Sequence, residues 1–204
     1  IEKKNFQWTT SFTISHNTQR VINIGSEDFV KVMDCPGNNK YMIYGYVEGY
    51  PLNSLWGFKY GGTWKSAEEF DRNRATNTYA DALTPERLGS PRYYDINHDG
   101  SLNQKDIVYL GNADPILYGG LQNTFYWKGL KVGVYFVYSL GGKIYNISEL
   151  FMSGSTTTNQ YRYMLNAWHP VRNPQSDIPA AGQSAGAALP SSYMVHDASY
   201  LRLK

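Results

Sequence analysis

The sequence LQNTFYWKGLKVGVYFVY, residues 121–138, decides the fold class of this chain. Apolar side chains take alternate positions on both sides of Lys128 and Gly129, a dipeptide of the length that joins antiparallel strands. Successive side chains of a strand point to opposite faces. The stretch therefore predicts a hairpin with one strongly apolar face, which must meet a protein core or lipid. That face carries Leu121, Asn123, Phe125 and Trp127 in the first strand and Leu130, Val132, Val134, Phe136 and Tyr138 in the second.

Further strands are predicted upstream of this hairpin. Residues 6–14 alternate between large apolar and small polar side chains, and residues 41–48 also predict a strand. Between them, residues 17–19 are typical of a turn, and residues 20–24 predict a return strand that ends at Gly25. The expected class is an all-β, antiparallel fold.

Helical signals are few and short. Ser66 and Glu69 form a capping box ahead of one or two turns, and residues 105–110 predict another turn of helix. Residues 153–192 are rich in small and polar residues and lack periodicity, which indicates a long surface loop. Loops of this length are unusual in compact soluble domains and ordinary on the outer side of membrane barrels.

The composition favours interfaces over nucleic acid. Aromatic residues reach 15%, with 18 Tyr and 5 Trp, while the mean hydropathy is −0.48, so much of the apolar area belongs to side chains with one polar end. This balance suits a β-rich surface binder or the aromatic girdles of a membrane barrel. The net charge is +2 and the sequence contains no long basic run, so nucleic acid is not expected as a partner. The single Cys35 excludes an intrachain disulfide.

The sequence DINHDGSLNQKD, residues 95–106, spaces oxygen donors as in an EF-hand-like calcium loop. Its acids repel one another unless a cation neutralises them, and Gly100 stands where such a loop turns sharply. Asp rather than Glu closes the loop, so weak affinity suited to millimolar extracellular calcium is expected. The alternative is an ordinary turn rich in Asp, Asn and Gly. The expected ligands are Asp95, Asn97, Asp99, Ser101 and Asp106, with Asn103 at the position that often binds through water.

Several blocks, taken in order, resemble the SusC/RagA family, the TonB-dependent outer-membrane transporters of Bacteroidota. Residues 94–100 are similar to the family's Y-x-D-x-N-G-D-G loop, although His98 stands where Gly is usual and takes positive φ less readily. In the family's W-T-P loop, His169 replaces the usual Thr. The matching blocks are residues 48–52 with 56–62, 94–100, 110–115 with 118–125, 141–146, 168–179 and 197–204.

The resemblance implies that residues 1–204 are a single fragment of the C-terminal part of a transmembrane β-barrel with long extracellular loops. A plug domain, a TonB-contacting segment and most strands would precede Ile1, and the last strands would follow Lys204. The whole protein would import glycans or peptides through the outer membrane with a SusD-like lipoprotein and TonB. The calcium loop would then be structural and hold an extracellular loop in place.

Aromatic residues in the loops are the candidate substrate contacts. They could stack on sugars or pack beneath the loops, and packing is the favoured interpretation because buried aromatic side chains usually contribute area first. The candidates are Tyr60, Trp64, Tyr161, Tyr163 and Trp168.

The sequence gives weaker support to two other classes of function. A soluble calcium-dependent module is possible because residues 95–106 also resemble half of a dockerin, but Gly111 and Pro115 interrupt the helix that should follow. An enzyme is not predicted, because Glu68 and Glu69 diverge by about 100° on a helix and no hydrolase or phosphate-loop motif occurs.

Overall fold

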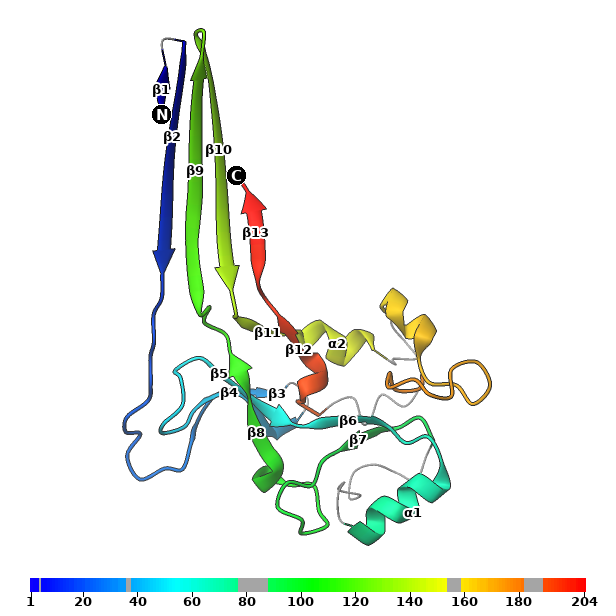
Figure 1. Ribbon diagram of the computed structural model, residues 1–204. Coiled ribbons are helices and arrows are strands. Elements are labelled where there is room, and N and C mark those ends of the chain that lie inside the picture. The colour runs from blue at the N-terminus through cyan, green and yellow to red at the C-terminus, as the bar shows by residue number, and fades with distance from the viewer. Residues whose placement is uncertain (4, 36–37, 77–87, 154–158, 182–188) are drawn as a thin grey trace.

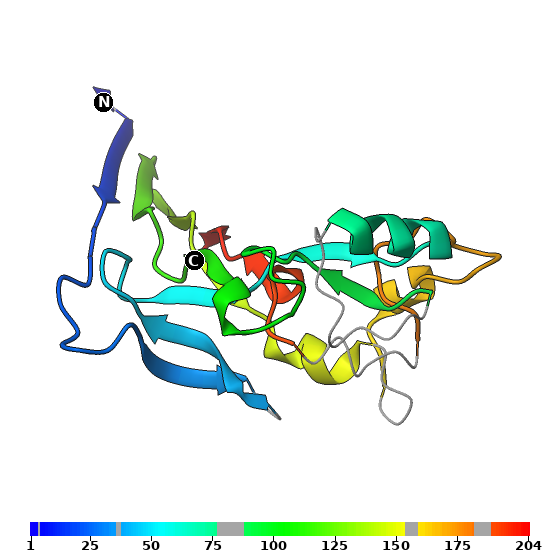
Figure 2. The same cartoon turned by 90° about the horizontal axis from the view of Figure 1, so that it is seen from below.

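The computed structural model describes residues 1–3, 5–35, 38–76, 88–153, 159–181 and 189–204. It consists of a tall sheet and a group of shorter elements at one end of that sheet (Figure 1). We call this second part the loop module. Seen along the long strands, the loop module extends mainly to one side of them (Figure 2). No helix in the described part of the chain is long and apolar enough to cross a membrane.

The tall sheet is antiparallel throughout, as the alternation in the sequence predicts. The hairpin is confirmed, since Trp127 pairs with Leu130 and the two residues between them have φ values of 45° and 88°. Left-handed backbone at both positions is the two-residue turn that matches the twist of paired strands. The strand order is β1 (Glu2–Lys3), β2 (Phe6–Ser15), β9 (Leu117–Trp127), β10 (Leu130–Leu140) and β13 (Tyr200–Leu203).

The unbroken register gives the tall sheet two different faces. Phe12 pairs with Leu121, Leu121 with Phe136, and Phe136 with Leu203, so large apolar residues from four strands share one face. The other face is polar and carries Gln7, Thr9, Ser11, Thr13, Gln122, Thr124, Tyr126, Lys131, Tyr135, Ser139 and Arg202.

The loop module contains a four-stranded antiparallel sheet and two short strand pairs. Several helices of one to three turns connect them, as Figure 1 shows. The four-stranded sheet has the order β3 (Val30–Cys35), β4 (Asn38–Tyr46), β5 (Ser54–Phe58) and β8 (Ile107–Asn112). The two pairs are β6 (Tyr60–Thr63) with β7 (Pro91–Tyr93) and β11 (Lys143–Tyr145) with β12 (Val195–Asp197). The helices are α1 (Ala67–Thr76), α2 (Ile147–Met152), η1 (Gln104–Asp106), η2 (Arg162–Asn166) and η3 (Ser192–Met194).

The buried side chains of the described residues lie in the loop module rather than on the tall sheet. One cluster packs around Phe58 and Tyr93, which are 0% and 1% exposed, and another around Leu55 and Met194, both 0% exposed. The loop module therefore has a protein core, whereas the tall sheet has none among these residues.

Two local predictions are wrong. Residues 20–24 form no strand, because Val21 uses its backbone N–H and C=O on Tyr50 and Gly49 of a neighbouring turn. Residues 107–112 are strand β8 rather than helix, since pairing with β5 overrides the local signal after a single 3-10 turn.

The remaining local predictions have mixed outcomes. Strand β4 confirms the strand predicted over residues 41–48, and α1 extends the predicted short helix to Thr76. The backbone N–H of Glu69 donates to Ser66 Oγ at 3.1 Å, as in a capping box, but Glu69 Oε2 accepts from Lys65 instead. Within residues 153–192, the described parts hold 3-10 helices and isolated bridges instead of long strands.

Candidate functional site

The loop at residues 95–106 is closed by its own hydrogen bonds. Both carboxylate oxygens of Asp106 accept backbone N–H groups at 2.9 Å, one from Ile96 and one from Asn103. Asp99 accepts the N–H of Ser101, and the side-chain amides of Asn97 and Asn103 also donate to it. These three donors, with Asn97 first, lower the pKa of Asp99 below its usual value.

The same loop leaves one oxygen available for a cation. Asp95 is only 2% exposed, and its Oδ2 accepts the N–H of Gly100 at 2.6 Å, but its buried Oδ1 has no hydrogen-bond partner. A buried carboxylate oxygen without a partner is costly, and a cation would satisfy it. However, no group of three His, Cys, Asp or Glu side chains in the described residues stands ready as a metal site. Among these carboxylates, the buried Oδ1 of Asp95 is therefore the observation that bears on calcium.

His98 takes a left-handed backbone conformation, which Gly adopts more readily than other residues. Its φ is 59°, and Gly100 two residues later has a φ of 80°. His98 therefore places a β-carbon in a sparsely allowed region of backbone conformation.

The predicted aromatic contacts do not form one binding surface. Trp64 and Trp168 are 1% and 9% exposed, so they pack inside the loop module. Tyr60 is partly buried, and its hydroxyl donates to the Asp177 carbonyl at 2.6 Å. Burial, followed by the neighbouring Tyr93 and Tyr193, raises the pKa of Tyr60 well above its usual value. These three residues serve packing and loop anchoring.

Tyr161 and Tyr163 stack on each other. Their ring centroids are 5.5 Å apart and their planes differ by 12°. Both are partly buried, and the Tyr163 hydroxyl lies 2.5 Å from Ser153 Oγ. The pair is therefore held in place, with some of its surface open to solvent.

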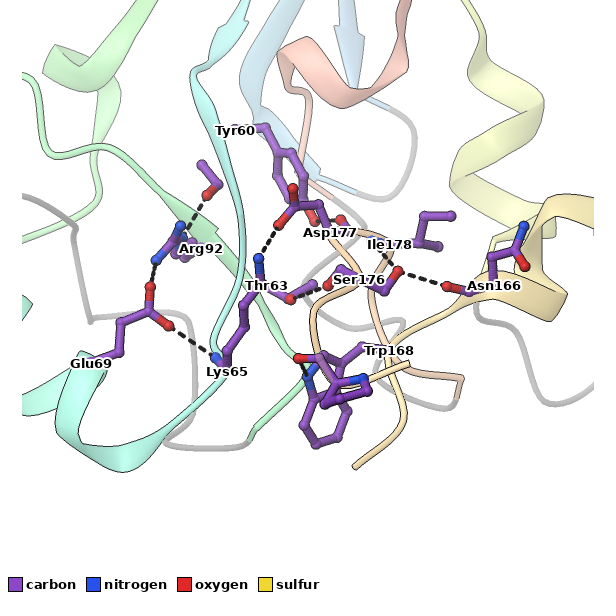
Figure 3. A network of polar contacts seen from close by, with 12 residues as sticks. Tyr60, Thr63, Lys65, Glu69, Arg92, Asn166, Trp168, Ser176, Asp177 and Ile178 are labelled. Carbon is purple, nitrogen blue, oxygen red and sulfur yellow. Dashed lines mark hydrogen bonds and ion pairs between the residues drawn. The ribbon is translucent and has the colours of Figure 1, made fainter. Parts of the chain in front are cut away.

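A polar network ties the segment around Asp177 to β6 and β7 (Figure 3). Lys65 Nζ lies 2.8 Å from Asp177 Oδ1, and Glu69 contacts both the Lys65 backbone and the Arg92 guanidinium. Thr63 Oγ1 donates to the Ser176 carbonyl at 2.7 Å. The network gives residues of this long loop a fixed position against the core.

A cavity that the aromatic candidates do not reach lies where the polar face of the tall sheet meets the loop module. It has a volume of about 620 Å³, within the range of small-molecule sites. A second cavity of about 340 Å³ adjoins it and shares Asn17, Gln19, Asp114 and Pro115 in its lining. We call the two together the junction groove. The first part is lined by Tyr118, Tyr135 and Tyr200, and the second by His16, Tyr109 and Lys143.

Sequence reasoning missed the junction groove. Its signal is a large aromatic residue on the polar face of an alternating strand, as at Tyr135, but this signal alone does not show which tyrosines meet. Their proximity depends on β9, β10 and β13 lying side by side.

Comparisons with known proteins identify the class to which this architecture belongs. No family model matches the chain. TonB-dependent receptor P26 of Formosa agariphila is 33% identical over 211 residues, which cover 100% of this chain and 20% of the receptor. TonB-dependent receptor P3 of the same organism is 27% identical over 205 residues, with the same two coverages.

Solved structures show the same fold. The structure of the RagAB peptide transporter aligns with a TM-score of 0.71 and 20% identity, covering 100% of this chain and 20% of that chain. The fold of this chain is thus mostly antiparallel β with few helices, like that of the RagA-type barrel. The chain belongs to the TonB-dependent receptors and spans about one fifth of the length of the curated relatives it matches. The family predicted from the sequence blocks is confirmed.

Proposed function

We propose that this chain is one sector, toward the C-terminal end, of an outer-membrane β-barrel that imports nutrients, either oligosaccharides or peptides. The two-faced tall sheet is the observation that carries the proposal. Strands β2, β9 and β10 have 10, 11 and 11 residues, the length that crosses a bilayer when tilted. One face is apolar and the other polar along all of them.

The apolar face has the properties of a lipid contact. Phe12, Leu130 and Leu203 are 60%, 58% and 63% exposed, and no described element covers them. A soluble protein rarely leaves so broad an apolar face in water. Lipid solvates these apolar side chains favourably, and the paired strands satisfy the backbone hydrogen-bonding groups between them.

The polar face would then line the water-filled interior of the barrel. The loop module sits at the end opposite the β9–β10 turn (Figure 1). Barrels of this type have short turns on the periplasmic side and long loops outside, so we place the loop module on the extracellular side. A SusD-like lipoprotein would meet these loops, and TonB would act through parts of the receptor outside this chain.

Calcium is proposed as a structural ion of the loop module. Asp95, Asn97, Asp99, Ser101 and Asp106 would hold it, as the spacing predicts. The calcium ion would neutralise the charge of these acidic side chains, and it would fix the connection between β7 and β8. The loop module would then present a constant surface to the lid or substrate.

A labelling experiment tests the barrel. Single cysteines are placed at the consecutive positions 131, 132, 133 and 134 of the full-length receptor, in a Cys35→Ser background, within outer-membrane vesicles. Positions 132 and 134 should react with a lipid-soluble maleimide, and positions 131 and 133 with a water-soluble one. Equal labelling of all four by the water-soluble reagent would contradict the barrel and favour a soluble calcium module.

The soluble module has weaker support. A dockerin-like unit needs a helix after its calcium loop, and residues 107–112 are a strand paired with β5. Western blotting of fractionated source cells gives a second test. An outer-membrane band much larger than 23.2 kDa supports the receptor, and a soluble band near 23.2 kDa supports the module.

A further inference from the structure

We propose that the junction groove is a subsite for a neutral oligosaccharide, with Tyr135 as its central stacking platform. This inference rests on the proposed function, because it treats the polar face of the tall sheet as facing the transport path. It differs from the sequence-based candidates, which lie in the loop module.

The groove brings three partly exposed tyrosine rings into one cavity. Tyr118, Tyr135 and Tyr200 are 37%, 41% and 45% exposed, and all three line the same cavity of about 620 Å³. They come from β9, β10 and β13, which are neighbours in the sheet. Sugar rings stack on such faces through their C–H surfaces, which suits the amphipathic character of tyrosine.

Two of these tyrosines are held in place without a ligand. A β-carbon on Gly120 would lie 2.9 Å from the Tyr135 ring, so the ring lies close across this glycine. Tyr118 is fixed differently, since Asn17 Nδ2 donates to its hydroxyl at 2.9 Å. A rigid platform loses little conformational entropy when a ligand binds, which favours affinity.

The polar groups of the first cavity are almost all neutral. Hydroxyl and amide groups of Thr13, Ser15, Asn17, Gln19 and Ser139 surround the tyrosines, and Asp114 is the only charged residue in the lining. Asp114 is already engaged, because Asn53 Nδ2 lies 2.9 and 3.0 Å from its two oxygens. Neutral donors and acceptors around aromatic faces match a polyhydroxylated chain better than a peptide with charged ends.

The test uses full-length receptor purified in detergent and calorimetric titration with neutral hexasaccharides. The probes are maltohexaose, cellohexaose, mannohexaose, xylohexaose and a β-galactan hexasaccharide, with an uncharged octapeptide of Gly, Ala, Ser and Thr as the competing class. Tyr135→Ala should weaken the bound hexasaccharide about tenfold, and Tyr135→Phe should stay within about threefold of wild type because it keeps the ring.

Tyr126→Ala is the matched control. Tyr126 lies on the same polar face and is 39% exposed, but it pairs with Gln7 and Lys131 near the β9–β10 turn, outside the groove. Its loss should leave affinity unchanged. Retention of heat-modifiable electrophoretic mobility shows that each variant is folded.

Each outcome of the titration either supports or overturns the proposed subsite. A hexasaccharide that binds and depends on Tyr135 supports it. Binding that is equal in wild type and Tyr135→Ala overturns the site, and binding of the octapeptide alone, or of no hexasaccharide, overturns the ligand class. The cysteine labelling tests the barrel proposal separately from the subsite proposal. If the labels alternate but no hexasaccharide binds, the subsite proposal is overturned and the barrel proposal stands.

Discussion

The Tyr135 ring lies across Gly120, so that a β-carbon on this glycine would stand 2.9 Å from the ring. On the opposite face, a β-carbon on the preceding Gly119 would lie 2.8 Å from the Tyr138 hydroxyl and 2.0 Å from the Thr13 carbonyl oxygen. Two consecutive glycines of β9 thus each receive a tyrosine of β10, one on each face of the sheet. The two tyrosine side chains explain why β9 contains glycine at positions where residues of high β-propensity are usual.

Alanine substitutions at three glycines of the tall sheet should have graded effects on stability. Gly119→Ala meets the backbone of β2 and should cost about 3 kcal/mol, whereas Gly120→Ala meets chiefly a side chain and should cost about 1 kcal/mol. Gly133→Ala has nothing within 4 Å and should be neutral or slightly stabilising. Urea unfolding in lipid vesicles measures the three. Equal losses would show that these contacts do not control the strand.

The hydrogen bond from Trp8 Nε1 to Asn123 Oδ1, 3.0 Å long, satisfies two polar groups on the apolar face. Asn123→Leu should destabilise by about 1 to 3 kcal/mol, because it leaves the indole N–H without its partner. The double variant Trp8→Phe with Asn123→Leu should recover part of this loss. Additive single effects in this double-mutant cycle would show that the two side chains do not interact.

Gly89→Ala should loosen the docking of Trp168, while Gly25→Ala serves as its control. Both glycines have left-handed φ, 84° and 88°, so both variants carry backbone strain of about 1 kcal/mol. Only at Gly89 would the new β-carbon also meet the Trp168 ring, at 2.4 Å. Greater protease cleavage within residues 166–180 is expected in Gly89→Ala alone. Matching cleavage in both variants would assign the effect to backbone strain.

Asp95→Ala should weaken calcium binding more than Asn103→Ala. Asp95 supplies a charged, direct ligand with a buried and unpartnered oxygen, and Asn103 stands at a position that often binds through water. Titration with calcium at millimolar concentration measures both variants in the full-length receptor. Equal affinity in wild type and Asp95→Ala would rule out the proposed ligand set.

Asp197 should make the loop module sensitive to acid. Hydrogen bonds from the Ser199 side chain and backbone, and then Lys143, lower the pKa of Asp197 from 3.8 to about 2. Because the folded state binds this proton less readily, the stabilisation is present above pH about 4 and is lost as the pH falls toward about 2. Asp197→Asn should therefore be less stable than wild type at pH 7, and the difference should shrink across this window.

Lys143→Gln is the control for this pH effect. Lys143 Nζ lies 3.1 Å from Asp197 Oδ2, so its loss should move the acid transition to higher pH without abolishing it. Thermal unfolding at a series of pH values follows both variants. A constant difference between wild type and Asp197→Asn from pH 7 to pH 2 would exclude this carboxylate as the source.

Contiguous patterns in the sequence predicted three strands of the tall sheet and the family. The alternation over residues 6–14 and 121–138 and the turn at Lys128–Gly129 are contiguous, and strand geometry converts them directly into two faces. The ordered blocks predicted a TonB-dependent receptor, and the similarity to P26 and P3 bears this out.

The arrangement of the loop module and the junction groove does not follow from local sequence patterns. Residues 20–24 alternate like a strand, yet Val21 bonds to Gly49 and Tyr50 in a turn 28 and 29 residues away, and residues 107–112 became a strand because β5 was available to pair. Packing beneath the loops was the favoured interpretation of Trp64 and Trp168, and their burial confirms it, but the sequence did not show which segments cover them. Local patterns record which face a side chain takes, whereas burial, pairing and the meeting of three tyrosines in a groove depend on residues far apart in the chain.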